Sequence, residues 1–273
     1  MDKEKQNVMD NYAIVTGAGA GLGFAFATEM ATKGYNIILV SLPGEDLENK
    51  ATVMTDKYKV KVRFFETDLS QEANCISLHE WVVQQGLKVS VLINNAGIGS
   101  TNPFLDFKPG FYTKQILVNI MAPVLLCRLF IPTMIESGTK AYILNVGSLG
   151  GFFHIPNKEV YGATKAFIHS FTNSLQLKLE DTQISMMVVC PGPVETNDRL
   201  KDAHKNMKGL AKKAVMHPHE VAAKAVDSLF KGKKILVPGR INNLFLALDW
   251  VVPNFIKNRI LRKEMIRQAS FSR

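Results

Sequence analysis

Residues 12–23 read Tyr-Ala-Ile-Val-Thr-Gly-Ala-Gly-Ala-Gly-Leu-Gly, and this stretch decides the fold that the sequence predicts. A short apolar run ends in a glycine-rich turn, and an amphipathic helical pattern follows. Glycine lets the backbone turn sharply and approach a bound group closely, while the N-terminus of a helix offers free amides and a positive dipole end. The spacing is Thr-Gly-x-x-x-Gly-x-Gly rather than the strict G-x-G-x-x-G. The order strand, turn, helix favours a nucleotide-binding turn over a merely tight glycine turn.

Short β-branched runs alternate with longer helical patterns along the rest of the chain. The runs are almost continuously apolar, as strands of a parallel sheet covered on both faces must be. The segments between them are long enough for right-handed crossover helices. We therefore expect an α/β fold, a Rossmann-like doubly wound parallel sheet of about seven strands with helices on both faces. The expected strands are residues 12–16, 36–40, 60–65, 89–93, 142–146, 184–189 and 234–237.

No repeat, low-complexity tract or flexible linker divides the 273 residues, so one domain is expected. We assign residues 1–11 to a polar tail and residues 12–240 to a single domain, with a lysine-rich lid over about 196–216. Residues 241–273 form an apolar and basic helical extension of the same domain. Ligands of such sheets bind beyond the carboxyl ends of the strands, so the informative residues are expected just after the strands.

Composition narrows the class of protein. The net charge of +9 is mostly dispersed and comes with no zinc, RNA-binding or DNA-reading pattern, so we expect no nucleic-acid partner. Cys75, Cys127 and Cys190 lie far apart beside apolar stretches, which favours buried free thiols in a reducing compartment and no metal site. The first residues lack the apolar stretch of a secretory signal, and no apolar run reaches the roughly 18 residues of a membrane span. We expect a cytoplasmic protein.

Tyr161 and Lys165 are the strongest candidates for chemistry. Four residues apart on a helix, they project from one face. A phenol has an unperturbed pKa of roughly 10, and a nearby ammonium stabilises the phenolate and lowers that value. The pair is a plausible proton donor and acceptor, although YxxxK alone is also compatible with an ordinary exposed helix.

The rest of the chain supports the catalytic interpretation, because it resembles the classical short-chain dehydrogenase/reductase family. The matching motifs occur in order along nearly all of the sheet-forming region: the glycine-rich turn, Asp68-Leu69, Asn94-Asn95-Ala96-Gly97, Asn119, Ser148, Tyr161, Lys165 and Pro191-Gly192. The resemblance is specific for fold and chemistry but not for substrate. Ketoacyl reductases and hydroxysteroid dehydrogenases are the relatives that share such C-terminal extensions.

By this resemblance, Tyr161 exchanges the proton with the carbonyl or alcohol oxygen, and Lys165 lowers the pKa of the phenol and holds the nicotinamide ribose. Ser148 hydrogen-bonds the carbonyl oxygen, and Asn119 helps to hold a water that connects Lys165 to solvent. The residue matching Asp68 hydrogen-bonds the adenine, although Asp68 is equally a helix N-terminal charge. The residues expected at the cofactor are Gly17, Ala20, Gly21, Leu22, Gly23, Ser41, Asp68, Leu69, Asn95, Ala96, Gly97, Tyr161, Lys165, Pro191, Gly192, Val194 and Thr196.

The end of the second strand bears on the choice of cofactor. Ser41 stands where the NAD-selective members of the family often carry Asp, so the repulsion of a 2′-phosphate is removed. Leu42 stands where NADP-selective relatives often carry Arg, and Ala20 supplies no cation either. NADP(H) is favoured, and NAD(H) remains open.

Apolar and basic segments surround the expected substrate end. Phe152, Phe153 and Ile155 follow Ser148, the lid is rich in lysine, and residues 244–253 are strongly apolar. A substrate pocket with apolar walls and a basic lid suits a lipophilic carbonyl compound on an acidic carrier, such as a 3-oxoacyl thioester. A hydroxysteroid is the alternative substrate. A nucleotide-binding redox sensor and a membrane-surface adaptor are the non-enzymatic alternatives. The C-terminal segment is expected to cap the pocket, to bury itself in a homodimer or homotetramer, or to touch a membrane surface.

Overall fold

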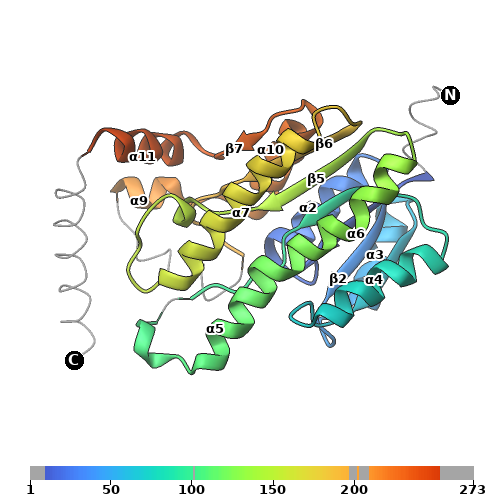
Figure 1. The fold of residues 1–273 in the computed structure, drawn as a ribbon, viewed down its shortest axis with the longest axis horizontal. Helices are drawn as coiled ribbons and strands as arrows, with labels where there is room; N and C mark the ends of the chain where they lie inside the picture. Colours follow the sequence, from blue (N-terminus) through green and yellow to red (C-terminus); the bar gives the residue numbers. More distant parts are fainter. Residues whose placement is uncertain (1–9, 101, 197–201, 203–208, 253–273) are drawn as a thin grey trace.

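The computed structural model describes residues 10–100, 102–196, 202 and 209–252. Seven strands form one parallel sheet in the order β3-β2-β1-β4-β5-β6-β7, so the predicted doubly wound fold is confirmed (Figure 1). The chain leaves β1 in one direction to build β2 and β3, and then crosses back to build β4 to β7. The strands are β1 (Tyr12–Thr16), β2 (Asn36–Ser41), β3 (Val62–Glu66), β4 (Val89–Asn94), β5 (Ala141–Val146), β6 (Ile184–Val189) and β7 (Ile235–Leu236).

The two edge strands differ most from the expected ranges. β3 begins at Val62 rather than at residue 60, where its pairing with Ile37 of β2 starts. β7 has two residues instead of four, because only Val188 and Val189 of β6 pair with it and Pro238, which has no N–H to donate, follows closely. Strands at an edge have one neighbour, so their ends depend on local pairing more than on apolar pattern.

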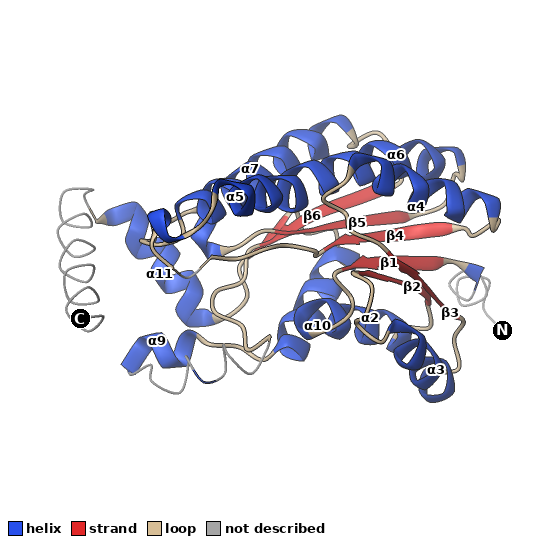
Figure 2. Ribbon diagram, turned by 90° about the horizontal axis from the view of Figure 1, so that it is seen from below, coloured by secondary structure: helices blue, strands red, loops and turns tan. Residues whose placement is uncertain are grey.

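Helices cover both faces of the sheet (Figure 2). One face carries α4 (Glu72–Gln84), α6 (Ala122–Glu136) and α7 (Glu159–Lys178), and the other carries α2 (Gly21–Thr32), α3 (Leu47–Tyr58) and α10 (Pro218–Phe230). Successive strand residues point to opposite faces. Ala13 and Val15 therefore pack with the α2 layer, while Ile14 and Ile38 pack with the α4 layer. Burying each large aliphatic side chain contributes roughly 1.5–3 kcal/mol. The three cysteines are buried and free, as predicted.

The segment Pro109–Glu136 is a continuous helical rod made of α5 (Pro109–Ile116), a π-helical turn (Leu117–Met121) and α6. By length and composition this rod would suffice to cross a membrane. The sequence analysis did not predict such a helix, because polar residues interrupt its apolar run. The rod packs on the sheet, however, and contributes Leu126, Phe130 and Met134 to the core. We interpret the rod as a central helix of the domain.

The carboxyl ends of the strands meet the remaining short elements. These are the 3-10 turns at Phe104–Asp106 and Leu149–Gly151, α9 (Gly209–Ala214) and α11 (Arg240–Val251). Figure 1 shows α9 and α11 beyond the carboxyl end of the sheet, on the side where α5 also lies. The N-terminal tail up to residue 9, most of the expected lid, and residues 253–273 of the extension lie outside the described residues. The division into tail, domain and extension stays a prediction.

Candidate active site

The glycine-rich turn after β1 is built for close approach to an anion. Gly17 and Gly21 adopt φ values of +64° and +55°, which favour glycine. A Cβ on Gly17 would lie 2.9 Å from the Ala96 Cα in the neighbouring loop, so no side chain fits there. Ala20, at the N-cap of α2, makes no side-chain cap hydrogen bond, and the first turn of α2 has no acidic residue. The amides of this helix end are therefore suited to a pyrophosphate.

Thr16 and Asn95 join this turn to the loop after β4. The Thr16 Oγ1 accepts hydrogen bonds from the backbone N–H groups of Asn95 and Ala96, both at 3.0 Å. The Asn95 Nδ2 donates to the backbone oxygens of Thr16 and Gly17, at 2.9 and 3.3 Å. β1 and β4 are neighbours at the point where the strand order reverses, which is where sheets of this kind bind ligands. Asn95 therefore shapes the binding loops through its side chain.

Lys165 lies deep in the site. Its Nζ donates to the Val146 backbone oxygen at the end of β5, 2.8 Å away, and lies 5.8 Å from the centre of the Tyr161 ring. A Cβ on Gly97 would lie 3.4 Å from the Lys165 Nζ, which places the loop after β4 directly beside the ammonium. Both α7 residues of the YxxxK motif thus face the carboxyl ends of the central strands.

The pKa values of this pair differ from the simple expectation. Burial raises the pKa of Tyr161, and a hydrogen bond from Ser148 acts in the opposite direction. Burial lowers the pKa of Lys165 to about 8. In the protein alone, burial therefore affects the pKa of Tyr161 more than the predicted lowering by Lys165 does. Burial removes water from both groups and so disfavours the phenolate and the ammonium alike. Hydrogen bonding from Ser148 is the effect that favours the phenolate here.

Ser148 follows β5 and starts the 3-10 turn Leu149–Gly151. Its Oγ accepts a hydrogen bond from the Gly150 N–H at 3.0 Å. A Cβ on Gly150 would lie 3.4 Å from the Ser148 Oγ and 3.6 Å from the Tyr161 Cε1, so the serine and tyrosine side chains border the same small space. The oxygen of Ser148 serves as the acceptor in the turn, so its hydroxyl hydrogen can point into that space toward Tyr161.

Asn119 occupies the π-helical turn between α5 and α6, a feature that often marks functional sites. Its Oδ1 accepts from the Ile98 N–H at 2.8 Å, and its Nδ2 donates to the Ile98 oxygen and to the Thr164 Oγ1, both at 3.0 Å. Thr164 in turn donates to the Tyr161 backbone oxygen at 2.7 Å. Asn119 therefore ties the loop after β4 to the helix of Tyr161. The motif analysis of the sequence did not include Thr164, and the only indication of its role there was its position next to Lys165.

The loop after β6 closes the site from the other side. The Leu149 N–H donates to the Pro191 oxygen at 2.9 Å, and Val194 forms a parallel bridge to Met216. A Cβ on Gly21 would lie 2.8 Å from the Thr196 Cβ, which brings Thr196 to the N-terminus of α2. The predicted cofactor residues after β1, β4 and β6 thus converge at the carboxyl ends of the central strands.

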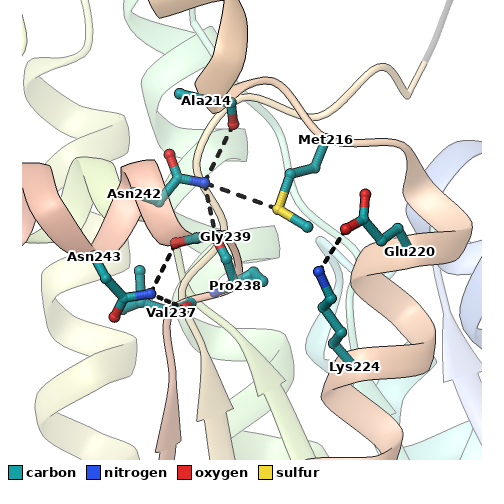
Figure 3. A network of polar contacts seen from close by, with 9 residues as sticks. All are labelled: Ala214, Met216, Glu220, Lys224, Val237, Pro238, Gly239, Asn242 and Asn243. Carbon is teal, nitrogen blue, oxygen red and sulfur yellow. Dashed lines mark hydrogen bonds and ion pairs between the residues drawn. The ribbon is translucent and has the colours of Figure 1, made fainter. Parts of the chain in front are cut away.

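Asn242, on α11, is a further residue that sequence reasoning missed (Figure 3). Its Nδ2 donates to the oxygens of Ala214 and Pro238, at 3.2 and 2.8 Å. Its side chain also fills the space beside Gly192, where a Cβ would lie 2.7 Å from the Asn242 Cγ. The only signal in the sequence was a polar residue just before an apolar segment, and the structure buries it to 1% exposure. Through Asn242 the C-terminal extension supports the loop after β6.

Asp68 and Leu69 follow β3, one strand away from Ser41. The Asp68 carboxylate accepts from the Ser70 N–H at 3.0 Å and pairs with Lys114 at 2.9 Å. Burial acts to raise the pKa of Asp68, and the hydrogen bonds from Lys114 and Ser70 outweigh it, so the pKa is lowered. Asp68 therefore stabilises its own turn, and its contact with adenine stays a prediction.

Apolar side chains lie beside Tyr161, where the substrate end is expected. A Cβ on Gly150 would lie 3.6 Å from both the Ile155 Cδ1 and the Tyr161 ring. Phe152 and Phe153 pack with Leu246 of α11 against a buried cluster below the site. The apolar wall and the C-terminal segment therefore pack on the same buried cluster, and whether that segment caps the pocket stays a prediction.

Comparison with known proteins identifies the family of this chain. The model of the short chain dehydrogenase family matches residues 11–207. The chain is 33% identical to very-long-chain 3-oxoacyl-CoA reductase-A of Danio rerio over 192 residues, which are 69% of this chain and 59% of that protein. It is 34% identical to the very-long-chain 3-oxoacyl-CoA reductase of Pyrenophora tritici-repentis over 175 residues, 62% of this chain and 50% of that protein. The chain thus spans about half to three fifths of the length of these relatives.

Among solved structures, the fold is similar to that of a short-chain dehydrogenase from Sphingobium yanoikuyae in complex with NADPH. The TM-score is 0.77 and the identity 25%, over 88% of this chain and 93% of that one.

Proposed function

Since this chain belongs to the short-chain dehydrogenase family, we propose that it is an oxidoreductase that interconverts a carbonyl and a secondary alcohol with a nicotinamide dinucleotide. The observation that carries the proposal is the grouping of Tyr161, Ser148 and Lys165 beside the glycine-rich turn. A proton donor, a hydroxyl hydrogen-bond donor and a buried cation border one space, at the edge of the sheet where the dinucleotide turn lies.

Each residue has a defined part in this reaction. The dinucleotide supplies the hydride in reduction and accepts it in oxidation. In reduction, the phenol of Tyr161 gives its proton to the carbonyl oxygen as the carbon becomes a carbinol. The hydroxyl of Ser148 donates a hydrogen bond to the same oxygen and stabilises its developing charge. The ammonium of Lys165 stabilises the resulting phenolate, and a water that Asn119 would help to hold connects Lys165 to solvent, from which the proton is regained.

We propose a lipophilic substrate, with a 3-oxoacyl thioester as the first candidate. Support comes from Ile155 beside Tyr161, from the cluster of Phe152, Phe153 and Leu246, and from the two relatives named as 3-oxoacyl-CoA reductases. A basic chain also suits a phosphate-bearing carrier, because its positive field attracts anions.

The cofactor is a nicotinamide dinucleotide, and different observations support its two forms, NAD(H) and NADP(H). The neutral Ser41 and the NADPH bound by the Sphingobium relative support NADP(H). The carboxylate of Glu45, to which Ser41 donates a hydrogen bond, supports NAD(H).

We further propose a homodimer or homotetramer in the cytoplasm. The described helices expose large apolar side chains that a second copy would cover, among them Ile135 on α6 and Phe167 and Leu177 on α7. Leu244 and Leu248, four residues apart on α11, are also exposed and would suit a second subunit or a membrane surface.

A substrate panel with both reduced dinucleotides tests the proposal. We expect consumption of NADH or NADPH with 3-oxoacyl thioesters, and a loss of about 10²–10⁴-fold in turnover in Tyr161→Phe with dinucleotide binding retained. Inert thioesters with reactive ketosteroids would transfer the assignment to the hydroxysteroid class. Undiminished turnover by Tyr161→Phe would remove this residue from proton transfer. If no carbonyl reacts, and liposome binding survives the loss of Tyr161, the surface-adaptor function takes its place.

A further inference from the structure

The loop between β2 and α3 brings a carboxylate onto the dinucleotide turn. Glu45 lies in this loop, and its side chain lies against the backbone of Gly19. A Cβ on Gly19 would overlap the carboxylate of Glu45 and lie 2.7 Å from its Cδ. The absence of a side chain at Gly19 therefore leaves the space that Glu45 fills.

Two hydrogen bonds hold Glu45 in this position. The hydroxyl of Ser41, at the end of β2, donates to the Glu45 carboxylate, and the Nζ of Lys50 on α3 donates to the Glu45 backbone oxygen. Ser41 is buried, so its end of the contact is anchored in the sheet. The turn itself is joined to the same strand, because the Ala18 N–H donates to the Val40 oxygen at 3.1 Å.

The position of this carboxylate has a chemical meaning. In doubly wound sheets the pyrophosphate lies at the first helix N-terminus, and the adenosine ribose lies near the end of the second strand. A carboxylate there accepts hydrogen bonds from the ribose hydroxyls and repels a 2′-phosphate. The sequence shows only the neutral Ser41 at that strand end, whereas the structure shows that Ser41 holds an acid from four residues further along the chain.

The charges around the loop strengthen this effect. Asp46 follows Glu45, and Glu66 accepts a hydrogen bond from the Gly44 N–H at 3.3 Å, so three acids gather at this loop. Lys50 uses its ammonium on the backbone oxygen of Glu45, and within the described residues the Glu45 carboxylate has no ion-pair partner. A 2′-phosphate would therefore meet three carboxylates against one ammonium at this loop, a net negative charge that repels it.

We propose that Glu45 is the specificity-determining residue for the cofactor, and that it makes this chain bind NAD(H) in preference to NADP(H). The proposal rests on the proposed function, since it concerns the same dinucleotide site. It replaces the NADP(H) preference expected from Ser41 alone.

Calorimetric titration with NADH and NADPH tests this inference without a substrate. We expect the wild-type protein to bind NADH about tenfold or more tightly than NADPH. Glu45→Gln keeps the shape of the side chain and removes its charge, so its affinity for NADPH is expected to rise about tenfold while that for NADH changes little or falls slightly. Ser41→Ala, which releases Glu45 from β2, is expected to shift the ratio in the same direction by a smaller factor.

Glu48→Gln is the matched control, because it removes the same charge from an exposed position in the first turn of α3. Its NADH-to-NADPH affinity ratio should equal that of the wild type. Equal or tighter wild-type binding of NADPH, or a ratio unchanged by Glu45→Gln, would overturn the assignment of Glu45 while leaving the proposed function intact.

Should Glu45→Gln fail to fold, Glu45→Asp is the substitute variant, because its shorter side chain retracts the charge. It is expected to move the affinity ratio toward NADPH, and an unchanged ratio would overturn the assignment. Binding of neither dinucleotide by the wild type would overturn the proposed function itself.

Discussion

Lys165 combines deep burial with a role that needs its positive charge. Because burial lowers its pKa from 10.5 to about 8, the ammonium is half lost at about pH 8 and is nearly complete only about one pH unit lower. We therefore predict that kcat/KM for the reduced dinucleotide, which reports on the free enzyme, is level between about pH 6 and 7 and falls above about pH 8, approaching tenfold per pH unit. An ordinary exposed lysine would place this fall near pH 10.

A stopped-flow or steady-state profile between pH 6 and 10 measures this dependence. Lys165→Arg is a useful comparison, because a guanidinium keeps its charge throughout this range and should remove the fall near pH 8, whatever its absolute rate. A wild-type profile that stays level to pH 9.5 would contradict the role assigned to the ammonium.

Thr164 is a positioning residue, since its hydroxyl accepts from Asn119 and donates to the backbone oxygen of Tyr161. Thr164→Val keeps the shape of the side chain but leaves the buried Asn119 Nδ2 without one of its two acceptors. We predict a loss of about 1–3 kcal/mol in unfolding free energy and a lower kcat with little change in the KM for substrate. Thr164→Ser keeps the hydroxyl and is expected to restore both values. A Thr164→Val protein as active as the wild type would show that this chain of contacts has no part in positioning Tyr161.

At the scale of elements, α11 and the loop after β6 support one another through Asn242 and Gly192. A Cβ on Gly192 would lie 2.8 Å from the Asn242 Nδ2, so Gly192→Ala overpacks this contact and is expected to cost about 1–3 kcal/mol. Asn242→Ala removes the obstacle together with hydrogen bonds to Ala214 and Pro238. We predict that the double variant is less destabilised than the sum of the single variants by about 1 kcal/mol, as urea unfolding would show.

Asn243 supplies the control for this cycle. It lies next to Asn242 on α11 and also donates to backbone oxygens, those of Val237 and Gly239 (Figure 3). The three heavy atoms nearest to a Cβ on Gly192 all belong to Asn242 and none to Asn243. Gly192→Ala combined with Asn243→Ala should therefore give additive losses. Additivity in the Asn242 pair as well would mean that α11 does not support the loop.

At the scale of the whole molecule, the sequence predicts those features of the fold and the site that depend on local residue patterns. Apolar runs and helical spacing predicted all seven strands, and the order of the motifs predicted that the residues after β1, β4, β5 and β6 meet at one edge of the sheet. β7 is shorter than expected because pairing at the edge, not composition, sets its length. Glu45, Thr164 and Asn242 escaped prediction because their parts depend on which loop folds onto which. A neutral Ser41 in the sequence gave no sign that it would hold a carboxylate.

The most direct test of the central claim is to follow the hydride itself. Reduced dinucleotide deuterated at nicotinamide C4 would be mixed with the wild-type protein and a 3-oxoacyl thioester, and the product examined by mass spectrometry. The account predicts one deuterium on the new carbinol carbon with the wild type, and at least a hundredfold slower transfer with Tyr161→Phe that still binds the dinucleotide. Failure of every carbonyl in the panel to take up the label from a tightly bound dinucleotide, or undiminished transfer by Tyr161→Phe, would contradict it.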